Sequence, residues 1–492
     1  MVKYDYLFYI VGRENVFITI LIHHSMVQPN SANNSNPAIE PLTSLPNQNV
    51  SNSSGEKSGM KYPWAVFVAL AMGMLVYGVA ESYGPVFAIG GIIPAKYAFL
   101  GLSLPYIAGG VGALLSGGLA DRIGRKGSFM ITSAMIVVGI AIYLAGQLAP
   151  SSSSTYLIAL IISFILIGMA AIGLETPILS MMAEAVPAKN RGRSLVIVQN
   201  FGNIGVGITF IPLLLGLSKT ANDIALGLLF FAPLIALAIA WRLMSESAPW
   251  TAIKGGTKSD VEDAWVGQDG DTEKVHVSVG LPMRFLILIL IGVAQDVAFV
   301  YFSYGVGYDY FYGTNGILAA TIPLIGGLTM AVVGIVAGLL FVDRVSRKTF
   351  TIFSYGILVG FWAILWVYEA ATGAVSGLLL VVILTLLFIP GEITWASRGM
   401  LEPELFPTLK RGTYVSVVRF VVWVSAGVIT GSLTYLADNG FSFNGSAAIV
   451  MVVFIISLAM TVLWQRRGFE TKAMSLSGLD KNIQKPTDES TK

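Results

Sequence analysis

Long apolar segments recur along the whole 492-residue chain and constrain its fold more than any other feature. Crossing the ~30 Å hydrocarbon core of a bilayer takes about 20 mostly apolar helical residues. A helix is the expected form, because lipid cannot satisfy the hydrogen bonds of an open strand. The segments that meet this requirement are residues 62–88, 97–120, 129–148, 156–180, 195–218, 224–241, 285–308, 317–342, 349–368, 371–397, 412–437 and 440–464. We therefore expect an all-α membrane protein with 12 transmembrane helices.

Composition supports this environment and narrows the classes of function. Hydrophobic residues make up 55% of the chain and charged residues only 12%, whereas soluble domains carry about 25% charged residues. The net charge of +2 gives no field that would attract nucleic acid. Cysteine is absent, and His23, His24 and His276 all lie outside the apolar segments. We therefore expect no metal, no cofactor and no enzymatic activity, since a membrane-bound enzyme would need such groups.

Basic residues concentrate in alternate loops and predict the orientation of the helices. Lys and Arg in short loops mark the cytoplasmic side of a membrane protein. One set of connections holds most of the loop Lys and Arg, whereas the opposite set holds only Lys96 and Lys219. Both termini are therefore predicted to face the cytoplasm, in a multi-pass protein of the plasma (cytoplasmic) membrane.

The hydrophilic segments predict how the chain is divided. Residues 27–60 are rich in Asn, Ser and Pro, which indicates disorder. One hypothesis is that translation starts at Met26 or Met60. The predicted parts are a largely disordered N-terminal extension (1–61), a six-helix bundle (62–243), a cytoplasmic linker (244–280), a second six-helix bundle (281–465) and a cytoplasmic tail (466–492).

Two short patterns each occur twice and indicate an internal duplication. The pattern Asp-Arg-x-x-Arg-Lys begins at Asp121 and again at Asp343, an offset of 222 residues. The pattern Glu-x-x-Pro-x-x-x-Arg-Gly begins at Glu184 and at Glu404, an offset of 220 residues. All four copies fall in predicted cytoplasmic loops. The two six-helix bundles are therefore expected to be related by a pseudo-twofold axis along the membrane normal.

These motifs resemble those of the major facilitator superfamily. The stretch Gly117–Lys126 looks like the signature loop between helices 2 and 3 of that family. The Glu-x-x-Pro-x-x-x-Arg-Gly pattern in both halves, with Glu246–Trp250 and Gly391–Trp395, is similar to the sugar porter and metabolite:proton symporter branch. The resemblance implies the major facilitator fold and the transport of a sugar, a polyol or an organic acid.

Ionisable residues inside the predicted spans are the first candidates for the site. They are Glu81, Glu175, Asp296, Glu392 and Arg419. Such residues cost roughly 2.5–3.5 kcal/mol on insertion scales and normally face a cavity or a partner. Glu81 and Asp296 lie on equivalent helices of the two halves, and a carboxylate removed from water can exchange a proton near neutral pH. Both are therefore candidates for proton coupling, and the alternative places them at the outer interface.

The partners of the other ionisable residues are also predicted. We expect Arg419 to pair with Glu392 or with an anionic group of the solute, unless it extends to the cytoplasmic interface. Glu175 either takes part in the site or pairs with a basic loop residue. Arg398 is expected at the cytoplasmic interface.

Uncharged polar residues add a candidate solute pocket. Gln199, Asn200 and Asn203 share the fifth span at helical spacing, Gln295 precedes Asp296, and Trp395 lies on the tenth span. Amides that bind hydroxyl groups, beside an aromatic ring, suit a sugar or a polyol. Hydrogen bonds between helices are the alternative role of these amides.

The charged residues of the repeated motifs are predicted to form a cytoplasmic gate. By resemblance, they form ion pairs that hold an outward-open state, and retention of positive loops in the cytoplasm is the alternative. We expect Asp121, Arg125, Glu184 and Arg191 to pair beneath the first half, and their counterparts beneath the second. The full set is Asp121, Arg122, Arg125, Glu184, Arg191, Asp343, Arg344, Arg347, Glu404 and Arg411.

The combined prediction is a secondary active transporter that works by alternating access. A monomer in the lipid bilayer would move a small polar organic solute, with protons as the coupling ion. Uniport and proton-coupled efflux by antiport are alternatives within transport. A non-transporting nutrient sensor is a further alternative, but the extensions of this chain are short for that task.

Overall fold

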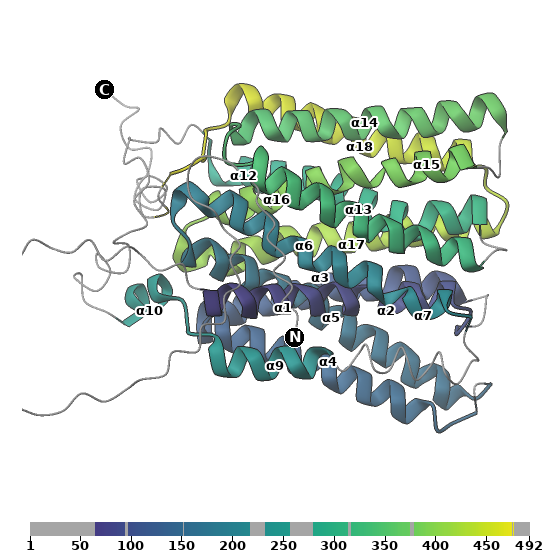
Figure 1. Ribbon diagram of the computed structural model, residues 1–492, viewed down its shortest axis with the longest axis horizontal. Helices are drawn as coiled ribbons and strands as arrows, with labels where there is room; N and C mark the ends of the chain where they lie inside the picture. The colour runs from purple at the N-terminus through teal and green to yellow at the C-terminus, as the bar shows by residue number, and fades with distance from the viewer. Residues whose placement is uncertain are drawn as a thin grey trace, which may run out of the picture. The chain divides into compact units, whose positions relative to one another are not determined.

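The computed structural model describes residues 64–93, 97–150, 152–216, 232–255, 279–312, 316–373, 378–474 and 476, which are almost entirely helical (Figure 1). All of them belong to one compact unit, residues 59–492. The predicted N-terminal extension, most of the linker and most of the tail lie outside the described residues.

The helices fall into two groups, named here by the predicted duplication. The first-half helices are α1 (Trp64–Glu81), α2 (Tyr83–Ile89), α3 (Ala98–Ile123), α4 (Arg125–Gly146), α5 (Ser154–Ala185), α6 (Arg191–Thr209), α7 (Ile211–Leu214) and α9 (Ala232–Leu243). The second-half helices are α12 (Leu281–Val300), α13 (Gly316–Leu340), α14 (Arg347–Thr372), α15 (Leu378–Leu386), α16 (Phe388–Glu404), α17 (Arg411–Asp438) and α18 (Phe443–Arg467). Between the groups lies α10 (Ala248–Gly255), and π-helical turns (Tyr301–Gly305 and Gly307–Tyr312) extend α12.

Eleven helical segments in the described part of the chain are long and apolar enough to cross a membrane. Each overlaps one of the predicted spans. The remaining predicted span, 224–241, lies partly outside the described residues, and its described portion is α9. The predicted span 371–397 was wrong at both ends, because the observed segment runs over Leu379–Glu404. Gly373, with a φ of 56°, ends α14 in the left-handed conformation and leaves Thr372 on the preceding helix.

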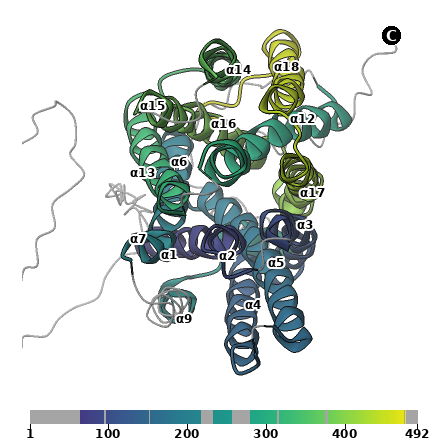
Figure 2. The same ribbon diagram turned by 90° about the vertical axis from the view of Figure 1, so that its right-hand side faces the viewer.

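The most extensive contacts between the two groups are made by two helix pairs. Viewed end-on, α3 lies beside α17, and α6 lies beside α13 (Figure 2). Glycines allow the first pair to approach closely: Gly117 of α3 lies against Gly412 and Ser416 of α17, and Gly427 of α17 lies against Ser103. Small residues at helix interfaces are the usual means of close packing in lipid.

Close packing within the first half yields a direct test. A Cβ at Gly112 of α3 would meet the backbone of Met169 on α5, whereas a Cβ at Gly118 meets nothing within 4 Å. We expect Gly112→Ala to lower the free energy of unfolding by about 1–3 kcal/mol. Gly118→Ala on the same helix is the matched control and should be neutral or stabilising. Thermal unfolding in detergent measures both, and equal midpoints for the two variants would contradict the packing described here.

Candidate functional site

Five buried charged residues form a continuous chain of ion pairs between α12, α16, α17 and α5. Arg398 Nη1 donates to Asp296 Oδ2 at 2.8 Å, and its Nε lies 3.6 Å from Glu402 Oε1. Arg419 Nη2 donates to Glu402 Oε2 at 2.6 Å and to Glu175 Oε1 at 3.1 Å. All five side chains are at most 1% exposed. This ion-pair chain joins a first-half helix to three second-half helices.

Two expectations about these partners were wrong, and one alternative is excluded. Arg398 does not lie at an interface, because α16 continues past the apolar segment to Glu404 and neighbouring carboxylates neutralise the arginine where it is. Arg419 pairs with Glu175 and Glu402, not with Glu392. Glu175 therefore binds a helical arginine, not a basic loop residue. Glu402 was missed, although its spacing of four residues from Arg398 was a usable signal.

Glu392 of α16 is held instead by amides of α6, across the boundary between the two groups. Asn200 Nδ2 donates to Glu392 Oε1 at 2.9 Å, and Asn203 Nδ2 donates to Oε2 at 2.6 Å. Both carboxylate oxygens thus accept a hydrogen bond from the first half. The absence of a Cβ at Gly334 of α13 leaves room for the amide of Asn200 beside Glu392.

Other predicted site residues are buried with unsatisfied polar atoms. Glu81 is 2% exposed and interacts with the side chain of Tyr77, but neither of its carboxylate oxygens forms a hydrogen bond of good geometry with a described residue. The same holds for both amide atoms of Gln199 and for Oε1 of Gln295. Asp296 and Glu175 are close enough to act on Glu81 electrostatically. Buried polar groups are normally hydrogen-bonded, so these atoms are unusual, and a role for them in solute binding stays a prediction.

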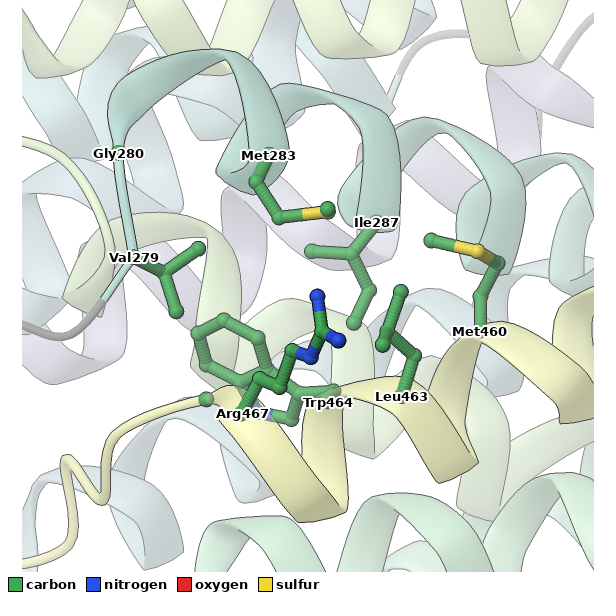
Figure 3. Close-up of a pocket in the computed structure, with 9 residues that line it drawn as sticks. Val279, Gly280, Met283, Ile287, Met460, Leu463, Trp464 and Arg467 are labelled. Atoms are coloured by element: carbon green, nitrogen blue, oxygen red, sulfur yellow. The ribbon is translucent and has the colours of Figure 1, made fainter.

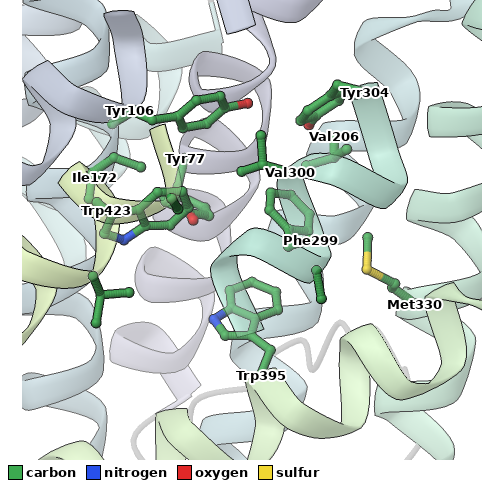
Figure 4. Packing of buried hydrophobic residues seen from close by; sticks show 14 of the residues in the cluster. Tyr77, Tyr106, Ile172, Val206, Phe299, Val300, Tyr304, Met330, Trp395 and Trp423 are labelled. Carbon is green, nitrogen blue, oxygen red and sulfur yellow. The ribbon is translucent and has the colours of Figure 1, made fainter. Parts of the chain in front are cut away.

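Several aromatic rings lie close together in the buried core, among them Tyr77, Tyr106, Trp395 and Trp423 (Figure 4). Trp395 Nε1 donates to Glu175 Oε1 at 3.2 Å, and its ring centroid lies 6.3 Å from that of Tyr77. Tyr106 of α3 stacks on Trp423 of α17 at 5.6 Å, so this aromatic pair also joins the two groups. Sequence reasoning selected Trp395 but missed the other three rings, because aromatic residues are frequent in membrane helices.

Two ion pairs join the groups at the ends of the helices that carry the repeated motifs. Arg411 Nη1 lies 2.7 Å from Glu184 Oε1, and Arg191 Nε lies 3.0 Å from Glu404 Oε1. The expectation that Arg191 and Arg411 pair within their own halves was therefore wrong. Each arginine begins α6 or α17, the helices that contact the opposite group, and so reaches the acid there.

Comparison with known proteins identifies the family. Residues 64–431 match the family model of the Major Facilitator Superfamily. The chain belongs to the major facilitator superfamily. It is 25% identical over 388 residues to the sugar transporter ERD6-like 8 of Arabidopsis thaliana, covering 71% of this chain and 78% of the relative. It is 25% identical over 375 residues to the minor myo-inositol transporter IolF of Bacillus subtilis, covering 74% and 80%.

The solved structures show the same superfamily fold. The proton:xylose symporter XylE matches with a TM-score of 0.67 at 17% identity, over 86% of this chain and 99% of XylE. The predicted resemblance to sugar-porter-like members of the superfamily is confirmed. The protein is therefore a multi-span membrane protein of a transporter family.

The other charged residues of the repeated motifs form ion pairs within their own group of helices. Arg125 pairs with Asp121 at 3.0 Å and with Glu184 at 2.9 Å. Arg347 pairs with Asp343 at 3.5 Å and with Glu404 at 3.3 Å. The structure brings these residues together as expected.

The two aspartates of the motif also reach the opposite group. Asp121 accepts hydrogen bonds from the backbone N–H of Gly412 at 3.2 Å and of Thr413 at 2.7 Å, in the first turn of α17. Asp343 accepts from the backbone N–H of Arg193, in the first turn of α6, at 3.1 Å. A carboxylate at a helix N-terminus stabilises the helix dipole.

Two members of the predicted gate lie apart from these contacts. Arg122 and Arg344 are exposed and form no ion pair with a described residue. Their role in a gate stays a prediction.

Proposed function

We propose that this protein is a plasma-membrane proton symporter for a neutral polyhydroxyl solute, a sugar or a polyol, and works by alternating access between two six-helix halves. The relatives named as sugar and myo-inositol transporters and the likeness to a proton:xylose symporter support the solute class and the coupling ion. The proposed halves are residues 62–243 and 281–465, and a monomer contains both.

The observation that carries the proposal is a set of buried polar contacts across the two groups. Glu392 is held by Asn200 and Asn203, and Glu175 is held by Arg419. Such contacts cost free energy to bury and are exchangeable for a solute that offers hydroxyl groups. A solute between the groups would compete for these amides and carboxylates and so bias the relative position of the halves.

The charges favour a neutral solute over an organic acid. Arg398 lies between Asp296 and Glu402, and Arg419 lies between Glu175 and Glu402. Both arginines are therefore committed to carboxylates. An anionic solute would have to displace a buried acid, whereas a sugar can use the amides and Trp395.

The ion-pair chain offers a route for proton coupling. A proton on Asp296 removes one charged partner from Arg398, which then interacts more strongly with Glu402. Glu402 in turn interacts less strongly with Arg419, the residue that binds Glu175 of the first half. Protonation at one end would thus change the contact that joins the groups at the other end. Glu81 is a second candidate for the proton.

The test uses purified protein in proteoliposomes, with xylose, glucose and myo-inositol screened first by thermal shift. An inward gradient of one pH unit should drive about ten-fold accumulation of the solute that binds. In Asp296→Asn, we expect binding to persist and accumulation to fall to about one-fold. Asp438→Asn, at the exposed end of α17, is the matched control and should behave as wild type.

Three other results would each decide against part of the proposal. Gradient-independent equilibration by the wild type indicates uniport, and accumulation driven by an outward proton gradient indicates antiport. Unchanged accumulation in Asp296→Asn rejects Asp296 as the coupling residue and directs attention to Glu81. Binding of carboxylates but of no sugar or polyol rejects the solute class.

A further inference from the structure

A cavity of about 240 Å³ lies outside the central site, between the first turns of α12 and the last turns of α18 (Figure 3). Its walls are mostly apolar: Val279, Met283 and Ile287 from one side, and Met460 and Leu463 from the other. The central ion-pair chain and the motif residues contribute nothing to its lining. A role in the transport site therefore does not account for it.

The two nitrogen-bearing side chains that line this cavity are both donors. Arg467 extends into it between Ile287 and Leu463 (Figure 3). Trp464 also lines it, is 2% exposed, and has an Nε1 group with no hydrogen-bond acceptor among the described residues. No Asp or Glu belongs to the lining. The site therefore favours a ligand that combines an apolar part with an anionic acceptor group.

The position of the cavity indicates where such a ligand comes from. Exposed Ile449, Val452 and Ile455 give α18 an apolar outer face. Arg466 and Arg467 end the helix on the side that the loop charges assign to the cytoplasm. Basic pockets between membrane helices on the cytoplasmic side bind the head groups of anionic lipids.

We propose that this cavity binds an anionic phospholipid of the cytoplasmic leaflet. Part of one acyl chain lies along Met283, Ile287 and Leu463, and the phosphate accepts hydrogen bonds from Arg467 and Trp464 Nε1. The lipid holds the start of α12 against the end of α18, and so stabilises the second-half helices. The binding is independent of which solute the protein transports.

The test measures lipid binding to the full-length protein by native mass spectrometry, after exchange into detergent with equal phosphatidylglycerol and phosphatidylcholine. We expect the wild type to retain phosphatidylglycerol about five-fold more strongly. Arg467→Gln should reduce this preference to about one-fold. Arg466→Gln removes the same charge one residue away and outside the cavity, and should keep the preference. Met283→Trp, which fills the cavity, should reduce the retention of both lipids there.

The opposite results overturn the proposal. An equal loss of preference in Arg466→Gln and Arg467→Gln indicates a general attraction of positive charge to anionic lipid, without a site. A wild type that retains both lipids equally rejects anionic selectivity. If inorganic phosphate raises the thermal midpoint as much as phosphatidylglycerol does, the cavity takes a free anion and not a lipid. If Met283→Trp fails to fold, Arg467→Gln and its control still decide the result.

Discussion

Replacing Arg419 by leucine is expected to lower the free energy of unfolding by about 3–5 kcal/mol. Arg419 is fully buried between Glu175 and Glu402, so its loss leaves Glu175 without its arginine and Glu402 with only Arg398 as a basic partner. Thermal unfolding of detergent-purified protein measures this effect. Arg419→Lys should be intermediate, because an ammonium group cannot donate to two carboxylates with the planar geometry of a guanidinium.

A matched control separates the burial of this charge from its mere presence. Arg466→Gln also removes one positive charge, but at the exposed end of α18, and should change stability by less than about 0.5 kcal/mol. Adding Glu175→Gln and Glu402→Gln to Arg419→Leu should restore part of the lost stability, because the uncompensated charges are gone. A midpoint for Arg419→Leu equal to that of Arg466→Gln would show that the ion-pair chain is not formed in the native protein.

The second large effect concerns the two ion pairs that join the groups at the motif ends. The double variant Arg191→Gln and Arg411→Gln removes the contacts to Glu404 and Glu184. We expect the state open to the cytoplasm to rise at least about ten-fold relative to the closed state, which takes about 1.4 kcal/mol. The chain has no cysteine, so Ser416→Cys, fully buried against Gly117, supplies a single reporter. Its rate of labelling by a membrane-impermeant maleimide from the cytoplasmic side should rise by the same factor.

The control for this experiment comes from the same loops. Lys189→Gln and Lys410→Gln also remove two positive charges there, but at exposed positions outside the predicted gate and without an ion pair to a described residue. That double variant should change the labelling rate less than about two-fold. Equal labelling rates for both double variants would show that the motif arginines do not close a gate. Their role would then be to orient the protein in the membrane.

The helices were predictable because a bilayer imposes a simple requirement on each span. Apolar length located the spans, and charge within an apolar segment selected Glu81, Glu175, Asp296, Glu392 and Arg419 as unusual. Arg398 was misplaced because a helix can continue beyond its apolar segment when its charges are neutralised within the protein. Partners were not predictable, since they depend on how the two groups of helices contact one another.

The same reason explains the other errors at the site. Arg191 and Arg411 were assigned to their own halves because sequence proximity was the only guide to their neighbours. Tyr106 and Trp423 were missed because nothing in the sequence distinguishes them from ordinary lipid-facing aromatics. Their significance follows only from the packing of α3 against α17.

The ion-pair chain contains three acids and two bases, and this odd number has a genetic consequence. The surplus of one negative charge belongs to the whole series, because each guanidinium can redistribute its hydrogen bonds between its two neighbours. Neutralising Asp296, Glu402 or Glu175 singly therefore gives the same total charge. Suppressors of a lost arginine should accordingly arise at any of these three acids.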